Sequence, residues 1–329
     1  MSTIHMVTAH AVSRLLFSTA SDYVRNYHSI QVPEYRVVSG QIEKTSTMIN
    51  TPVREYLNNR HTNRAGLAPH VRRRLKDHLL SIDLSYLFKG HFEVDTQGNV
   101  LTISKGGATI LSVNKLAVGS CFYGKGSPAM LAQAIELLGL WTVFRAEILN
   151  QDKKVLKGTF TTGKGEDKRK VPFEHAYEID DLQTMVDSYL GVDCNGFTGR
   201  YLKAKFPSLN VSPDTEEEAY VSRTADLRKP VADIPYLRKT VAEIAVNDTA
   251  VFNKGGRYHH VAMVSQVMPF SDNEMQVALA ESRTATMVHG GPQVNLFRVR
   301  RQKQEGNFDV VGRVGESFAR FVSPDRFKA

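Results

Sequence analysis

The segment GVDCNGFTGRYLKAKF, residues 191–206, contains Cys194, one of only two cysteines in a chain of 329 residues. Asp193 and Gly196 are turn-forming residues beside the thiol, and an apolar run at helical spacing follows them. This pattern predicts a helix with Cys194 in its first turn, where backbone N–H groups and the helix dipole favour a thiolate. We interpret Cys194 as a nucleophile, with Gly196 keeping the approach to the sulfur open. An ordinary half-buried thiol is the alternative.

A thiolate nucleophile needs an imidazole nearby, which accepts its proton and later protonates the leaving amine. The best candidate is His260, which stands at the start of the alternating, strand-like segment HHVAMVSQV, residues 259–267. A following strand-like segment, MQVALAESRT, offers Glu281 or Ser282 as a third group that orients the imidazole. The sequence therefore predicts a cysteine on a helix beside a histidine and an acid on neighbouring strands.

These segments resemble the papain-like cell-wall cysteine peptidases of the NlpC class. The resemblance covers roughly residues 171–300, and Asn195 and Thr198 stand where that class usually has serine and valine. The cysteine motif matches at Asp193, Cys194, Gly196 and Phe197, and a turn with a short strand matches at 248–252. The histidine motif matches at 260–264, and the polar residue on the next strand is Glu281.

The resemblance implies an α+β protein whose C-terminal domain packs the cysteine helix on an antiparallel sheet. It implies an amidase or endopeptidase acting on peptidoglycan stem peptides or murein fragments through a thioester acyl-enzyme, with no cofactor and no metal. Cys194 would attack, His260 would shuttle the proton, and Glu281 would orient the imidazole. Asp193, Tyr177 and Ser282 are expected as substrate or oxyanion groups.

The rest of the chain is predicted to be a separate N-terminal region that contains both helices and strands. Its basic loop KGEDKRK, residues 164–170, predicts a boundary between domains at 1–163 and 171–329. Before that loop we expect helices near 8–27, 52–60 and 68–82, strands within 91–113, a helix from Ser127 to Gly139, and a hairpin over 141–163.

Charge and composition leave several functions open. The net charge is +8, and residues 1–90 hold twelve Lys or Arg against six Asp or Glu, which favours an anionic partner for this region, such as nucleic acid, phospholipid or a cell-wall polymer. The densest basic run, VRRRLKDHLL, also suits a solvated helix face. The alternatives are a deamidase, transpeptidase or acyltransferase acting on another amide, and a basic nucleic-acid-binding protein whose thiol is incidental.

The N-terminal residues show neither a signal peptide nor a membrane span. We therefore expect synthesis in the cytoplasm, with any export by a secretion system or by phage lysis, as for a toxin or lysis factor. The sequence leaves an immunity or delivery partner unidentified.

Overall fold

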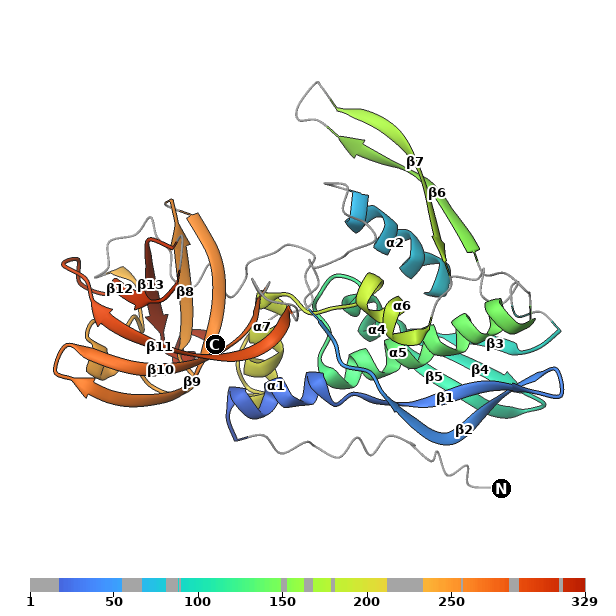
Figure 1. Cartoon of the computed structure of the whole chain (residues 1–329), viewed down its shortest axis with the longest axis horizontal. Helices are drawn as coiled ribbons and strands as arrows, with labels where there is room; N and C mark the ends of the chain where they lie inside the picture. Colours follow the sequence, from blue (N-terminus) through green and yellow to red (C-terminus); the bar gives the residue numbers. More distant parts are fainter. Residues whose placement is uncertain are drawn as a thin grey trace.

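The fold was analysed in a computed structural model of the chain, and it is α+β, as expected. The structure describes residues 18–54, 67–80, 88, 90–148, 153–162, 168–178, 181–211, 233–255, 257–283, 290–313 and 316–328. A barrel lies at one end of the molecule and a mixed helix and strand region at the other, with the helices α1 and α7 between them (Figure 1).

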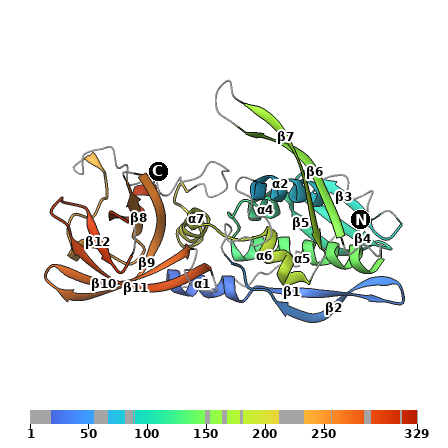
Figure 2. The same cartoon turned by 45° about the horizontal axis from the view of Figure 1, so that its top comes forward.

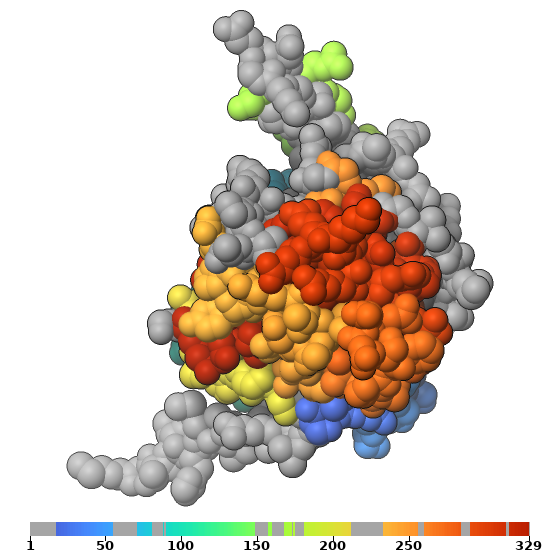
Figure 3. All heavy atoms as spheres, turned by 90° about the vertical axis from the view of Figure 1, so that its left-hand side faces the viewer, coloured from blue at the N-terminus to red at the C-terminus, as the bar shows by residue number. Residues whose placement is uncertain are grey.

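The C-terminal region is a closed barrel of six strands, in which every pair is antiparallel. Around the barrel the order is β10, β11, β12, β13, β8 and β9. The strands are β8 (Thr249–Lys254), β9 (Arg257–Ser271), β10 (Glu274–Arg283), β11 (Gly291–Arg301), β12 (Phe308–Val311) and β13 (Phe318–Val322). Short 3₁₀ turns lie before and after the strands, at Val241–Glu243 and Pro324–Phe327. Strands β8 to β13 fill most of the face seen in Figure 3. The sequence predicted an antiparallel sheet here but not its closure.

Strand β9 is buried on both of its faces over residues 260–265. Ala262 and Val264 belong to the apolar cluster inside the barrel, whereas Val261 and Met263 belong to a second cluster that includes α7 (Cys194–Lys205). Side chains alternate between the two faces of a strand. A strand that lies between two apolar layers therefore has an almost continuous apolar sequence, here VAMV at residues 261–264.

The N-terminal region packs its strands around one long helix, α5 (Figure 2). Its elements are α1 (Ala20–His28), β1 (Gln31–Val38), β2 (Gln41–Asn50), α2 (Leu67–Leu80), β3 (Glu93–Gln97), β4 (Val100–Lys105), β5 (Ala108–Asn114), α4 (Lys115–Cys121), α5 (Pro128–Val143), the π-helix Phe144–Ile148, and α6 (Leu182–Tyr189). Strands β1 and β2 pair with each other, and β3, β4 and β5 form a separate sheet. The predicted strands within 91–113 and helix near 68–82 are confirmed, whereas the hairpin β1–β2 was not predicted.

Helix α5 is the central element of this core. The helix begins where the sequence predicted: the Ser127 side chain accepts from the Met130 N–H, and Pro128 occupies the first turn. The helix does not end at Gly139 but runs on through Trp141. The expected first strand of a hairpin over 141–163 was wrong, because burial on all sides favours helix for this apolar run over its β propensity. Among the described residues, 128–148 is long and apolar enough to cross a membrane, and most of it is buried within the structure.

The predicted domain boundary falls inside a hairpin. Strands β6 (Lys153–Thr162) and β7 (Arg169–Glu178) pair along their whole length, from Lys153 with Glu178 to Thr162 with Arg169 (Figure 1). The basic loop connects two strands of one antiparallel pair and does not separate two packed units.

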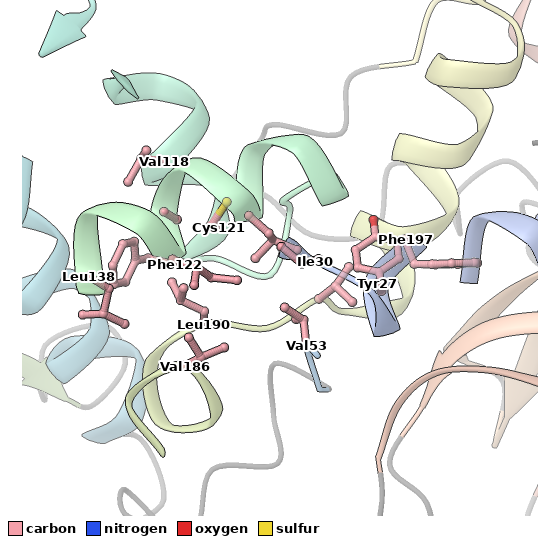
Figure 4. Close-up of a cluster of buried hydrophobic side chains, with 14 of the residues drawn as sticks. Tyr27, Ile30, Val53, Val118, Cys121, Phe122, Leu138, Val186, Leu190 and Phe197 are labelled. Carbon is pink, nitrogen blue, oxygen red and sulfur yellow. The ribbon is translucent and has the colours of Figure 1, made fainter. Parts of the chain in front are cut away.

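The cysteine helix shares its apolar core with the N-terminal region. The ring centroids of Tyr27 on α1 and Phe197 on α7 lie 5.8 Å apart, and those of Tyr23 and Tyr201 lie 5.7 Å apart. The cluster continues from Phe197 and Tyr27 through Ile30 to residues of α4, α5 and α6 (Figure 4). The α7 helix is therefore packed between the barrel and the N-terminal region.

Several expectations lie partly or wholly outside the described residues. These are the first half of the helix near 8–27, of which Ala20–His28 is helical, and most of the helix near 52–60. In α2 the basic run is divided, because Arg72 is buried and Arg73 and Arg74 are exposed. The exposed arginines agree with a solvated face, and an anionic partner remains a prediction.

Candidate functional site

Helix α7 begins at Cys194, as the sequence predicted. Asp193 is its N-cap, and the Asp193 Oδ1 accepts from the Gly196 N–H at 2.5 Å. The other oxygen, Oδ2, lies 2.5 Å from the ammonium of Lys125, whose side chain is only 5% exposed. Asp193 therefore caps the helix and neutralises a buried lysine. Asp193 thus has a structural role, and its expected contact with a substrate stays a prediction.

A loop of the N-terminal region holds this helix start in place. The Asp193 N–H donates to the Gly124 carbonyl at 2.9 Å, and Lys125 forms an isolated β-bridge with Val192. The Arg200 Nε also donates to the Lys125 carbonyl at 2.6 Å. The first turn of α7 is thus tied through its backbone to residues 124–125.

Gly196 is required by this contact. A Cβ at position 196 would overlap the Gly124 carbonyl oxygen and touch the backbone of Lys125. The expected role of Gly196, an open approach to the sulfur, stays a prediction. The missing side chain makes room for the loop.

The Cys194 thiol lies beside β9. The sulfur is half-buried and accepts hydrogen bonds from the backbone N–H groups of Val261 and Asn195. Burial raises the pKa of Cys194 to about 12, the charge of Asp193 adds to this, and the two N–H groups oppose it only partly. The thiol is therefore protonated at neutral pH. The expected thiolate was wrong, because desolvation outweighs the helix terminus.

His260 lies one residue before the strand position that the sulfur contacts. His260 pairs with Phe252 of β8, and the register then shifts so that Tyr258 pairs with Asn253, which leaves His259 as a bulge. The His260 ring centroid is 5.8 Å from that of Phe252, inside the barrel end. The sulfur meets β9 at Val261, and the imidazole lies on the inner face of the same strand.

His260 and Glu281 are joined by a hydrogen bond, as the sequence proposed. The His260 Nε2 lies 2.7 Å from the Glu281 Oε2, and both side chains are buried. Burial lowers the pKa of His260, although the hydrogen bond and charge of Glu281 oppose this. Since an ionised carboxylate only accepts hydrogen bonds, Nε2 is the donor. The neutral ring then carries its basic lone pair on Nδ1.

Glu281 remains ionised although it is fully buried. Burial alone would raise the pKa of Glu281, but the hydrogen bond and charge of His260, together with Arg313 and Asn295, lower it to about 2. Asn295 on β11 donates to Oε1 at 3.1 Å, and Arg313 contacts Oε2. Both carboxylate oxygens are therefore occupied.

Sequence reasoning missed Arg313, Asn295 and Lys125. Asn295 alternates with apolar residues along β11, and Arg313 follows Gly312, which turns the chain at φ 96°. No local motif marks either residue. Only the closure of the barrel brings β11 and the loop after β12 to Glu281.

The remaining predicted residues lie elsewhere or have other partners. The Ser282 hydroxyl is buried and donates to the Val192 carbonyl at 2.6 Å, so it ties β10 to the segment before Cys194 and is not available to a substrate. Tyr177 lies on β7, which pairs with β6 in a two-stranded sheet outside the barrel, and its expected role stays a prediction.

A cavity of about 250 Å³ lies at the barrel end beside this cluster. Phe252, Arg300, Asp309, Arg313 and Glu316 are among its lining residues. Within the described part of the chain, no group of three or more His, Cys, Asp or Glu is arranged to hold a metal ion.

Comparison of the chain with protein-family models, curated proteins and solved structures finds no match. The resemblance to the NlpC class therefore rests on the sequence motifs around Cys194, His260 and Glu281 alone.

Proposed function

We propose that this chain is a cysteine-dependent amide hydrolase with a papain-like catalytic arrangement. The observation that carries the proposal is the hydrogen bond between His260 and Glu281 on neighbouring strands, beside the strand position that the Cys194 sulfur contacts. The order of a helix-borne cysteine, a histidine on β9 and an acid on β10 is also the order in the class that the sequence resembles.

The proposed reaction starts from a neutral thiol and a neutral imidazole. The imidazole Nδ1 takes the thiol proton as the sulfur attacks the amide carbonyl, and Glu281 stabilises the imidazolium that forms. The positive end of the α7 helix dipole supplies partial positive charge for the oxyanion. Collapse breaks the C–N bond, the imidazolium protonates the amine, and water then hydrolyses the thioester. Proton transfer requires Nδ1 and Sγ to come within hydrogen-bond reach in the substrate complex.

The proposed substrate class is the peptidoglycan stem peptide. This choice rests on the resemblance of DCNGF and HVAMV to the NlpC class. The net charge of +8 supports it, because a positive surface attracts an anionic polymer.

Cys194→Ala should abolish cleavage of purified peptidoglycan and muropeptides, read by mass spectrometry of the products. Cys121→Ala is the matched control, because Cys121 is a fully buried thiol on α4 outside the cluster, so this variant should still release the fragments. The fragment masses identify the bond, and mass gained from an added amine would assign acyl transfer instead of hydrolysis. Fragments released equally by Cys194→Ala would contradict the proposal.

A further inference from the structure

Arg313 shares one carboxylate oxygen with His260. Its Nη2 contacts the Glu281 Oε2, the same atom that His260 Nε2 approaches at 2.7 Å. Its Nη1 lies 3.2 Å from a Glu316 oxygen, and its side chain is 1% exposed. Arg313 is therefore a buried cation at the centre of the polar cluster.

Two aromatic rings fix the guanidinium of Arg313. Its central carbon lies 3.7 Å from the Phe252 ring centroid and 5.1 Å from that of Phe297. The Phe252 ring also lies beside the imidazole of His260. Cation–π attraction and close packing leave the guanidinium one position, next to the Glu281 carboxylate.

We propose that Arg313 is a positioning residue that holds Glu281 ionised and in one orientation, so that His260 stays in its neutral Nε2–H form. The catalytic consequence rests on the proposed function, whereas the effect on the imidazole concerns the folded protein alone. Asn295 completes the arrangement by holding the second carboxylate oxygen. A carboxylate held by the two donors Arg313 and Asn295 presents a fixed acceptor to the ring.

The direction of the effect follows from the charges around the ring. Glu281 on β10 and Glu316 raise the pKa of His260, and Arg313 lowers it; the Arg283 guanidinium lies near Arg313 and Glu316. Without Arg313 the His260–Glu281 pair loses its compensating positive charge and binds a proton more readily. That proton either makes an imidazolium or protonates the carboxyl and moves the ring proton to Nδ1.

Arg313→Met tests this directly through nitrogen NMR shifts of His260 over a pH titration. The wild type should show a neutral Nε2–H ring at neutral pH. In Arg313→Met the apparent pKa of the pair should be higher by about 1 or more. Arg313→Lys, which keeps one positive charge, should give a smaller change of the same sign, and it provides the test if the methionine variant fails to fold.

Arg320→Met is the matched control, since Arg320 is a buried arginine of the same barrel that bonds Asn307. It should leave the tautomer and pKa of His260 unchanged. The same tautomer and pKa in wild type and both Arg313 variants would overturn the inference, as would an equal change in the control.

The kinetic readout separates this inference from the proposed function. On a cleaved muropeptide, Arg313→Met should lower kcat with little change in KM, and the acidic limb of its pH profile should move to higher pH. Wild-type protein without any hydrolysis would refute the proposed function, while the NMR titration would still decide the role of Arg313.

Discussion

Gly196 shows how one residue in the cysteine motif depends on a distant loop. The Gly124 carbonyl occupies the space that a Cβ at position 196 would need. The neighbouring Asp193 N–H donates to the same carbonyl. The glycine therefore allows the loop and the helix start to touch through their backbones.

Gly196→Ala should lower the free energy of unfolding by about 1–3 kcal/mol, because overpacking against backbone forces a shift. Gly119→Ala is the matched control: Gly119 is also a buried helical glycine, but its Cβ would meet only side-chain atoms at 3.8 Å. Alanine is the better helix former by about 1 kcal/mol, so the control should be neutral or stabilising. Denaturant unfolding measures both variants, and equal losses would contradict this account.

At the residue scale, the sequence located the groups with local signatures and missed those without one. Cys194, His260 and Glu281 were found from a helix start and two alternating strands, and the structure joins the last two by a hydrogen bond. Arg313 and Lys125 act through contacts made only in the folded chain. The state of the thiol was also mispredicted, since its burial is set by tertiary packing and not by the residues beside it.

At the element scale, the start of α7 depends on one aspartate with two functions. Asp193 caps the helix through the Gly196 N–H and pairs with the ammonium of Lys125. Removing the carboxylate would leave a cation buried without its counter-charge. Leaving a buried cation without its counter-charge lowers the free energy of unfolding by more than removing an exposed helix cap does.

Asp193→Ala should lower the free energy of unfolding by about 3 kcal/mol, since it leaves the buried ammonium of Lys125 without its counter-charge. Asp181→Ala is the matched control, because Asp181 caps α6 by accepting from the Thr184 N–H in an exposed position. Its loss should cost about 1 kcal/mol.

Adding Lys125→Met to Asp193→Ala should recover part of the stability, because it removes the uncompensated cation. Chemical denaturation of the single and double variants gives the coupling energy between the two side chains. Similar losses for Asp193→Ala and Asp181→Ala, or no recovery in the double variant, would show that the lysine pair contributes little.

Element prediction succeeded where local signals and tertiary packing agree. The helix starts predicted at Ser127 and Cys194 are true helix starts, and the strands expected within 91–113 form β3, β4 and β5. It failed at Trp141, where a β-prone run continues a buried helix, and at the unpredicted hairpin β1–β2. In the first case burial decides the structure, and in the second the exposed strand positions carry mostly polar residues with little β signal.

At the scale of the whole molecule, the cysteine site belongs to both regions of the chain. Helix α1 contacts α7 through aromatic rings and also reaches the barrel, where its Ser21 N–H donates to the Ser265 hydroxyl at 3.0 Å. His28 of α1 lies 2.6 Å from the Pro292 carbonyl. The N-terminal region therefore supports the site.

A chain of residues 171–329 alone should therefore lack the native site, although it contains Cys194, His260 and Glu281. It loses α1, the Gly124–Lys125 loop and the apolar surface that covers α7. We expect the Nε2–H signal of His260 and cooperative unfolding to be lost. Calorimetry and the NMR measurement described for Arg313 would show this.

The matched control is the full chain cut once between residues 163 and 167, with both pieces present. Strands β6 and β7 pair on either side of the cut, and the shared core holds the pieces together. This nicked protein should keep the His260 signal and unfold cooperatively. If residues 171–329 alone behaved like the nicked protein, the N-terminal region would be dispensable for the site. The predicted boundary would then describe a real division of the chain, and the contacts of Gly124 and Lys125 would be incidental to the fold of α7.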